Sequence, residues 1–173
     1  MNTIRTRTTA SAVAMVAVLS LTPPHAQTTQ ALSKEAGSLS DKFAGLARVM
    51  AGKYDWKPGE GVRSVGDVFN LIVTENGLLV ETLTCAGGGR GGGRGAQVTE
   101  PAKLQEALKT SYADLQKAIE RLSDGDLKAP VKLFGRDMTK EDAIRFLLGD
   151  QHEHLGQSIA YARTNGVVPP WSK

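Results

Sequence analysis

Cysteine is almost absent from this sequence of 173 residues, which contains only Cys85. One thiol cannot form an intramolecular disulfide, so the stability of the fold must come from its apolar core. A lone cysteine is more commonly a small buried apolar residue than a nucleophile. We interpret Cys85 in this way, with a reactive thiol as the alternative.

An excess of charge of one sign is also lacking, since 21 lysines and arginines and 18 aspartates and glutamates leave a formal net charge of +3. Arg5 and Arg7 lie in an N-terminal segment that resembles a signal. The loss of these two bases, and of no acid, would lower the net charge to about +1. So small a charge does not indicate a nucleic-acid or membrane-surface partner, and we expect neither.

The N-terminal apolar run, residues 10–21, is shorter than the ~20 residues that a membrane-spanning helix needs. It follows Arg5 and Arg7 and precedes the small residue Ala26, which is the arrangement of a secretory signal peptide. We therefore predict a signal over residues 1–26 and a periplasmic or secreted protein, with a membrane anchor as the alternative. The absence of a cysteine near the cut argues against a lipoprotein.

Strong strand patterns are missing as well. Residues 27–173 have a length that suits one domain with one core. Within them apolar residues recur at steps of three and four, which predicts amphipathic helices. The predicted helices cover residues 31–50, 65–83, 101–122 and 140–163. Four long helices joined by loops are typical of an all-α, up-down four-helix bundle.

Local signals mark where three of these helices start. Ser64 with Asp67, and Thr139 with Asp142, each place a short acceptor three residues before an acid, which is the pattern of a capping box. Thr99 is the predicted cap of the third helix.

Two segments between the helices contain helix breakers. Residues 86–95, AGGGRGGGRG, predict a flexible linker, because so much glycine is entropically costly to order. A phosphate-binding loop and an RGG-type nucleic-acid segment are the alternatives. The segment lacks the lysine and the preceding strand of a phosphate-binding loop, and its two arginines are too few for an RGG-type segment. Residues 127–137 alternate briefly in polarity, which is compatible with a small extended piece, but Pro130 and Gly135 argue against a real sheet.

The apolar stripes of two helices are interrupted near mid-helix. Glu75 and Asn76 interrupt the second helix, and Asp150 and Gln151 interrupt the fourth. If these helices pack side by side, the interruptions can meet. Buried polar groups must find partners or cost about 1–3 kcal/mol each, so they form either a ligand site or a hydrogen-bonded network. Spacing alone favours the network.

Two histidines follow the predicted signal, His152 and His154. Two positions along a helix are about 200° apart, so these side chains cannot bind one metal together. Asp150 and His154, four positions apart, share a face and offer two ligands for a divalent metal. We expect His152 to be a solvated surface residue.

Three stretches form a recognisable pattern: YDWKP at 54–58, RSVGDVFNLI at 63–72, and DQHEHLGQ at 150–157, which GVVPP follows at 166–170. In order and spacing they resemble the DinB/YfiT-like superfamily of metal-dependent hydrolases. The likeness covers nearly all of residues 27–173. It implies the four-helix bundle of that family.

The resemblance implies a metal site with one histidine on the second helix and a pair four residues apart on the fourth. The matching positions here are Leu71, Asp150 and His154. Leucine cannot coordinate, and the neighbouring Asn70 points about 100° away. Our hypothesis is that Glu75, one turn further on the same face, supplies the third ligand. Such a set would hold zinc, nickel or manganese and favour oxygen-loving metals more than three histidines do.

Two functions are compatible with this pattern. The first is an exported DinB-like domain with a degenerate or atypical metal site, which binds a small molecule or a partner such as a second copy of itself. The alternative is a metal-dependent hydrolase or thiol-dependent transferase, in which Glu75 is a ligand or general base and Gln157 or Tyr161 orients a substrate. Export weakens the transferase, because small thiol cofactors are mainly cytoplasmic. No substrate and no catalytic residue are assigned.

Overall fold

The computed structural model describes residues 24–85 and 97–172. Its elements are α1 (Pro24–Val49), the short 3-10 helix η1 (Ala51–Lys53), α2 (Val65–Thr84), α3 (Pro101–Glu120), α4 (Asp124–Lys128), β1 (Pro130–Leu133), β2 (Arg136–Thr139) and α5 (Lys140–Thr164). The four long helices agree with the predicted ones to within a few residues, except that α1 starts well before residue 31.

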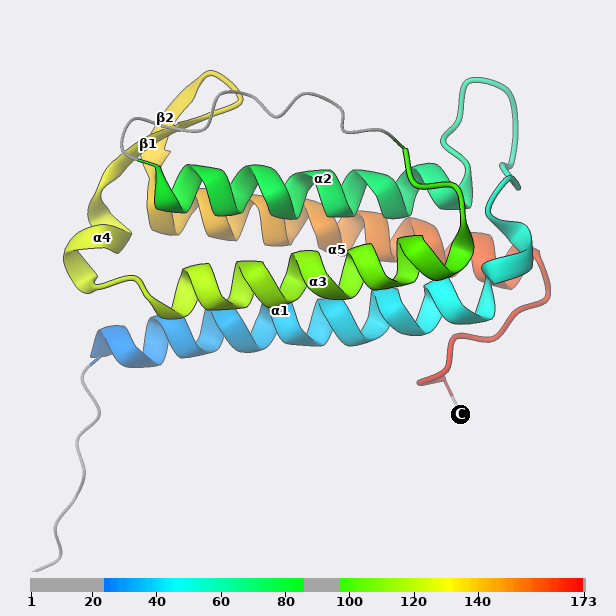
Figure 1. Ribbon diagram of the computed structural model, residues 1–173, viewed down its shortest axis with the longest axis horizontal. Coiled ribbons are helices and arrows are strands. Elements are labelled where there is room, and N and C mark those ends of the chain that lie inside the picture. The colour runs from blue at the N-terminus through cyan, green and yellow to red at the C-terminus, as the bar shows by residue number, and fades with distance from the viewer. Residues whose placement is uncertain (1–23, 86–96, 173) are drawn as a thin grey trace, which may run out of the picture.

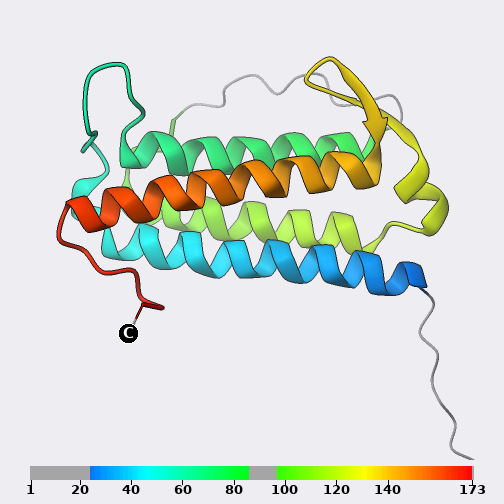
Figure 2. The same ribbon diagram turned by 180° about the vertical axis from the view of Figure 1, so that it is seen from behind.

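The helices α1, α2, α3 and α5 lie side by side along the long axis of the molecule and confirm the predicted all-α bundle (Figure 1). α1 packs against α3 and α5, and α2 packs against the same two helices. α2 and α3 run in one direction, and α1 and α5 run in the other (Figures 1 and 2). The order of directions is therefore up-down-down-up and does not alternate strictly along the chain.

The length of the link between α2 and α3 permits this parallel pair. Residues 85–100 separate the two helices, and a stretch of that length can extend over roughly 50 Å. The 20-residue α2 is about 30 Å long, so the chain can return to the same end of the bundle before α3 begins. The predicted flexible linker, residues 86–95, lies outside the described residues.

Side-chain caps fix the starts of α2 and α5, as predicted. The amide of Asp67 donates to Ser64 Oγ at 3.1 Å, and the amide of Asp142 donates to Thr139 Oγ1 at 3.1 Å. In both cases the acid bonds back to the cap, so the capping boxes are complete. Each cap satisfies a backbone N–H group of the first turn and defines where its helix begins.

The start of α3 differs from the prediction. Glu100, and not Thr99, is the N-cap, and it makes no side-chain cap hydrogen bond. The segment is held instead by Asn70 on α2, whose Nδ2 donates to the carbonyl of Val98 at 3.0 Å. The Asn70 Oδ1 accepts from the Val98 amide at 2.9 Å. Pro101 then occupies the first turn, where no N–H is needed.

Residues 127–137 overlap a short β-hairpin, whereas the sequence indicated at most a small extended piece. β1 pairs antiparallel with β2. Pro130 is the first residue of β1, where its missing N–H does little harm. Phe134 and Gly135 form the two-residue turn with φ of +49° and +77°, the conformation in which glycine is favoured. The proline and the glycine therefore bound the strand and do not interrupt it.

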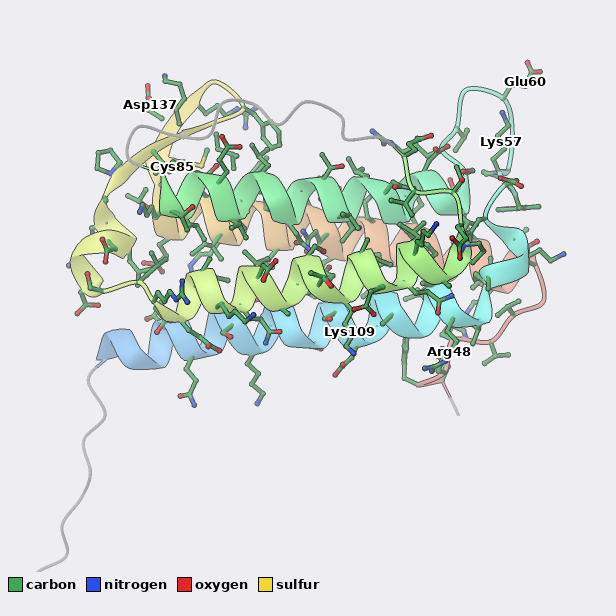
Figure 3. All side chains as sticks on the ribbon, viewed as in Figure 1. Arg48, Lys57, Glu60, Cys85, Lys109 and Asp137 are labelled. Carbon is green, nitrogen blue, oxygen red and sulfur yellow. The ribbon has the colours of Figure 1, made fainter. Side chains whose placement is uncertain are left out.

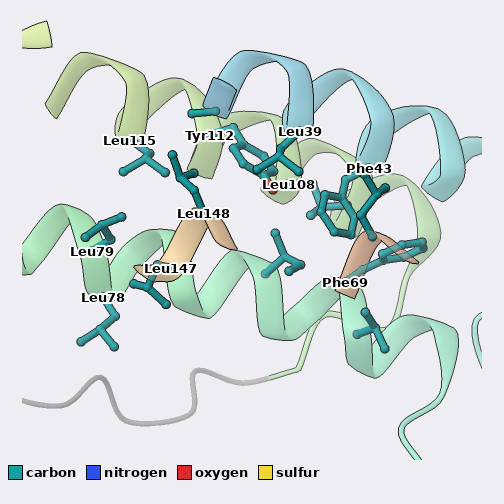
Figure 4. Close-up of a cluster of buried hydrophobic side chains, with 14 of the residues drawn as sticks. Leu39, Phe43, Phe69, Leu78, Leu79, Leu108, Tyr112, Leu115, Leu147 and Leu148 are labelled. Carbon is teal, nitrogen blue, oxygen red and sulfur yellow. The ribbon is translucent and has the colours of Figure 1, made fainter. Parts of the chain in front are cut away.

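The core lies between the four long helices and is rich in leucine (Figure 4). Phe43 of α1 is fully buried in this core. Its ring centroid lies 6.3 Å from that of Phe69 on α2, edge to face, and 6.3 Å from that of Tyr112 on α3, in a stacked arrangement. Full burial of such a side chain contributes roughly 1.5–3 kcal/mol, so these contacts fix the spacing of α1, α2 and α3.

Cys85 follows the last residue of α2 and is exposed (Figure 3), so its interpretation as a buried apolar residue is wrong. Leu83 is the last buried residue of the α2 stripe. Cys85 is the C-cap residue, and its backbone is already extended, with φ of −89° and ψ of 135°. The cysteine therefore leaves the core as the helix ends.

The predicted signal, residues 1–26, lies outside the described residues except for its last three. α1 begins at Pro24, just before the predicted cut after Ala26. In the described ranges, no helix combines the length and apolar character needed to cross a membrane. Export stays a prediction.

Candidate metal centre

The polar interruptions of α2 and α5 come together, because these helices are neighbours in the bundle. Glu75, Asn76 and Gln151 are buried, and Asp150 is half-buried. Adjacent residues on a helix point about 100° apart, so the two side chains of each interruption point in different directions. Glu75 and Asp150 belong to one cluster, and Asn76 and Gln151 belong to another.

Asn76 and Gln151 form a buried hydrogen-bonded network with α3. Gln151 Nε2 donates to Asn76 Oδ1 at 2.8 Å, and the Tyr112 hydroxyl donates to Gln151 Oε1 at 2.9 Å. Asn76 Nδ2 donates to Ser111 Oγ at 3.0 Å. Burial raises the pKa of Tyr112 far above its usual range, so the phenol stays a neutral donor. The network that spacing favoured is therefore present, beside a second polar cluster.

Glu75, Asp150 and His154 make up that second cluster. Each offers one ligand atom, and these atoms all lie within 4.8 Å of one another. His154 Nε2 is 3.6 Å from Asp150 Oδ2, as expected for residues four apart on one helix face. Glu75 approaches the pair from α2. The structure thus brings together the three residues selected from the sequence.

The carboxyl group of Glu75 is the least satisfied part of the cluster. Its side chain is only 6% exposed, and its Oε2 has no hydrogen-bond partner among the described residues. Burial, and then the adjacent Asp150 carboxylate, raise the pKa of Glu75 to about 8, although the charge of Arg63 and the amide of Gln151 oppose this shift. A buried oxygen in this position calls for a proton or a cation.

His154 contacts α5 residues on its other side. Its Nδ1 lies 3.0 Å from Gln157 Oε1, and Gln157 Nε2 donates to the Tyr161 hydroxyl at 2.7 Å. The Tyr161 hydroxyl donates to the backbone carbonyl of Arg63 at 3.2 Å. The sequence suggested Gln157 and Tyr161 as residues that orient a substrate. In the structure they bond to each other and to His154.

Other candidates from the sequence stand apart from the cluster. Leu71 is half-buried on α2 and has no ligand atom. Asn70 is engaged with the segment before α3, as described above. His152 is exposed, as expected, and its Nε2 lies 3.0 Å from Glu35 Oε1 on α1. Neither Asn70 nor His152 joins Glu75.

Sequence reasoning missed the residues that approach from outside the two interrupted helices. Arg63 precedes the cap of α2, and nothing in its spacing marked it as a neighbour of Glu75. Ser111 and Tyr112 lie on α3, in the gap between the stripe residues Leu108 and Leu115. Tyr112 is four positions after Leu108, and that spacing could have placed it on the buried face.

A profile of the DinB superfamily matches residues 23–158 of the chain. The chain belongs to the DinB superfamily. Two solved structures have the same fold: a DinB-like protein from Bacillus subtilis has a TM-score of 0.64 and 19% identity, over 79% of this chain and 92% of that one. A DinB-like protein from Bacillus cereus ATCC 10987 has a TM-score of 0.65 and 19% identity, over 84% of this chain and 95% of that one.

The chain is also 30% identical over 112 residues to the small ribosomal subunit protein uS11c of Phaeodactylum tricornutum, which covers 64% of this chain and 82% of that protein. A ribosomal role requires a strongly basic surface that neutralises RNA phosphates. The near balance of 21 basic and 18 acidic residues does not supply one. The helical fold and the DinB match agree with each other, and the family assignment rests on them.

The chemistry of the cluster suits a divalent cation. Two carboxylates and one imidazole are common ligands of divalent metals. The Oε2 of Glu75 has no hydrogen-bond partner in the described structure, and either a proton shared with Asp150 or a bound cation would satisfy it. Leu71 contributes no ligand atom, so Glu75 is the α2 residue that completes the set.

Proposed function

We propose that this DinB-superfamily protein binds one divalent metal ion through Glu75, Asp150 and His154. The observation that carries the proposal is the buried Glu75 Oε2, which has no hydrogen-bond partner in the described structure and belongs to a cluster of close ligand atoms. Two carboxyl groups this close cannot both ionise readily unless a cation lies nearby. A divalent ion would satisfy both and would use one ring nitrogen of His154.

The donor set favours hard metals more than three histidines would. Two carboxylates raise the affinity for manganese relative to that for nickel and zinc, although all three ions accept such ligands. Three protein ligands leave positions open for a bound small molecule. A metal held here would supply Lewis acidity toward an oxygen or sulfur atom of that molecule. The Asp150 side chain is 37% exposed, so the cluster is reachable from solvent.

Metal-dependent hydrolysis, or thiol-dependent transfer, is the second candidate function. The position of Glu75 beside Asp150, with its pKa raised to about 8, favours catalysis. A carboxyl group whose pKa lies near the working pH can hold and release a proton, as a general acid or base must. A metal bound directly to Glu75 would lower that pKa, so the roles of ligand and base compete for this residue.

Export belongs to the same proposal. Arg5, Arg7, the apolar run at 10–21 and the small residue Ala26 support a cleaved signal over residues 1–26. In the periplasm or outside the cell, small thiol cofactors are scarce. Hydrolysis is therefore the form of the enzymatic alternative that export favours.

The test is a measurement of metal content and affinity. Protein purified without chelator and without a histidine tag is analysed for bound metals and titrated by calorimetry with zinc, nickel and manganese. We expect near-stoichiometric binding in the wild type and its loss in Glu75→Ala and His154→Ala. His152→Ala is the matched control, because His152 lies on the same helix and contacts Glu35 outside the cluster.

Binding that is lost in both cluster variants and retained in His152→Ala supports the proposed site. An unchanged affinity in Glu75→Ala would contradict its role as the third ligand. A wild type that binds none of the three metals at micromolar concentration would contradict the metal proposal altogether, and a search for an organic ligand or a protein partner would follow.

A further inference from the structure

A chain of hydrogen bonds leads from His154 to the loop before α2. It begins at His154 Nδ1, passes through the side-chain amide of Gln157 and the hydroxyl of Tyr161, and ends at the backbone carbonyl of Arg63. The three distances are 3.0, 2.7 and 3.2 Å. All three side chains lie on α5, at steps of three and four residues, so they line one face of the helix.

The direction of this chain is determined from its far end. The carbonyl of Arg63 can only accept, so the single hydroxyl proton of Tyr161 is directed to it. Tyr161 must then accept from Gln157, which turns the Gln157 Nε2 toward the tyrosine. The Oε1 of Gln157 is left facing His154, and since an amide oxygen can only accept, the Nδ1 of His154 must carry a proton.

The proton on Nδ1 decides what the other ring nitrogen can do. A neutral imidazole carries one N–H, so His154 Nε2 is left with its lone pair. This nitrogen lies on the side of Asp150, 3.6 Å from Oδ2, and it is the nitrogen that a metal in the cluster would need. Asp150 competes for the same proton, because a carboxylate favours an N–H on Nε2. In that tautomer the nitrogen could not coordinate.

We propose that Gln157 and Tyr161 are positioning residues that hold the proton of neutral His154 on Nδ1 and so keep Nε2 open toward Glu75 and Asp150. Gln157 acts directly on the ring, and Tyr161 acts by fixing the orientation of the Gln157 amide. The consequence for metal affinity rests on the proposed function, whereas the tautomer is a property of the metal-free protein. Partners of this kind typically change metal affinity by about 10–100-fold.

The tautomer is measured by nitrogen-15 NMR of the histidine rings in the metal-free full chain, above the pH at which the imidazoles are charged. Spectra of His152→Ala and His154→Ala assign the signals. We expect a protonated Nδ1 and an unprotonated Nε2 for His154. In Gln157→Leu the proton should move to Nε2, next to Asp150, and the affinity for manganese or zinc should fall about 10–100-fold.

Two further variants separate positioning from a general loss of structure. Gln157→Glu keeps an acceptor beside Nδ1, so it should retain the wild-type tautomer and at least the wild-type affinity. Tyr161→Phe should give a mixture of tautomers and an intermediate affinity, because nothing then fixes the Gln157 amide. Tyr54→Phe is its control, since the Tyr54 hydroxyl also donates to a backbone carbonyl, that of Ala47, at 2.9 Å. It should leave His154 unchanged.

The outcomes distinguish this inference from the metal proposal. A wild type with its proton on Nε2, or a Gln157→Leu variant with unchanged tautomer and affinity, overturns the positioning role even if metal binds. If the wild type has the expected tautomer and Gln157→Leu changes it, the positioning role is supported. If the same wild type binds none of the metals, the metal proposal is overturned.

Discussion

Glu75 is a carboxyl residue whose ionisation depends strongly on the fold. It is buried on α2, Asp150 lies beside it, and one of its oxygens has no hydrogen-bond partner in the described part of the chain. Burial and the neighbouring carboxylate raise its pKa to about 8 from the usual 4.5. Without a metal, Glu75 is therefore largely protonated at neutral pH. A bound cation would reverse that preference.

This shift predicts how the stability of the metal-free protein depends on pH. Between pH 4.5 and about 8 the unfolded state has lost the Glu75 proton while the folded state retains it. The free energy of unfolding must therefore fall as the pH rises through this range. The contribution is on the order of a few kcal/mol. Urea unfolding with chelator at several pH values measures it.

Glu75→Gln removes this titration, so its stability should fall less between pH 5 and pH 8.5 than that of the wild type. Glu153→Gln, an exposed neighbour of the cluster on α5, controls for the loss of one charge and should follow the wild-type slope. Identical slopes in wild type and Glu75→Gln would show that the carboxyl group is not held protonated in the fold.

At the scale of the element, α2 contains two glycines with opposite surroundings. A Cβ on Gly66 would lie 3.3 Å from the backbone oxygen of Tyr54, and a Cβ on Gly77 would meet nothing within 4 Å. The amide of Gly66 also donates to that same oxygen at 2.9 Å, so the loop cannot easily move away. Close approach at Gly66 holds the start of α2 against the Tyr54 loop.

The two glycines therefore predict opposite effects of alanine. Gly77→Ala should stabilise the protein by about 0.5–1 kcal/mol, because alanine loses less backbone entropy in a helix interior. Gly66→Ala should bring no such gain and should lower stability, because the added methyl group crowds the Tyr54 carbonyl. Chemical denaturation of both variants tests the pair. A gain of similar size at both positions would contradict the close packing at Gly66.

At the scale of the whole molecule, the order of the helices creates the site. α2 lies next to α5 and runs opposite to it along much of the same length (Figure 2), and residues near the midpoints of the two helices meet. Glu75 and Asp150 occur near these midpoints. α3 supplies the other side of the buried network through Tyr112 and Ser111. One polar layer thus joins three helices in the middle of the bundle.

The N-terminal segment predicts where the chain is cleaved during export. If residues 1–26 are a signal, the exported protein begins at Gln27, and intact mass and N-terminal sequencing of periplasmic or secreted material will show this end. Val16→Arg, which places a charge in the apolar run, should block cleavage and retain the protein inside the cell. Recovery of uncleaved wild-type protein from the cytoplasm alone would contradict export.

Much of the fold and part of the candidate site were predictable from local sequence patterns. The long helices follow from apolar periodicity, and the starts of α2 and α5 follow from Ser64 and Thr139, because capping involves residues only three apart. The pairing of Asp150 with His154 is equally local, since residues four apart share a helix face. Local geometry determines these features whatever the helices pack against.

Other features were decided only by the tertiary structure, because they depend on residues far apart in the sequence. The same-direction pairing of α2 and α3 depends on where the chain re-enters the bundle after residue 85. The approach of Glu75 to His154, the action of Arg63 on Glu75 and the link from Asn76 to Ser111 each require helices to meet at a particular register. Apolar periodicity predicts which face of its helix a side chain occupies. Only the packing between helices determines which side chain of a neighbouring helix it contacts.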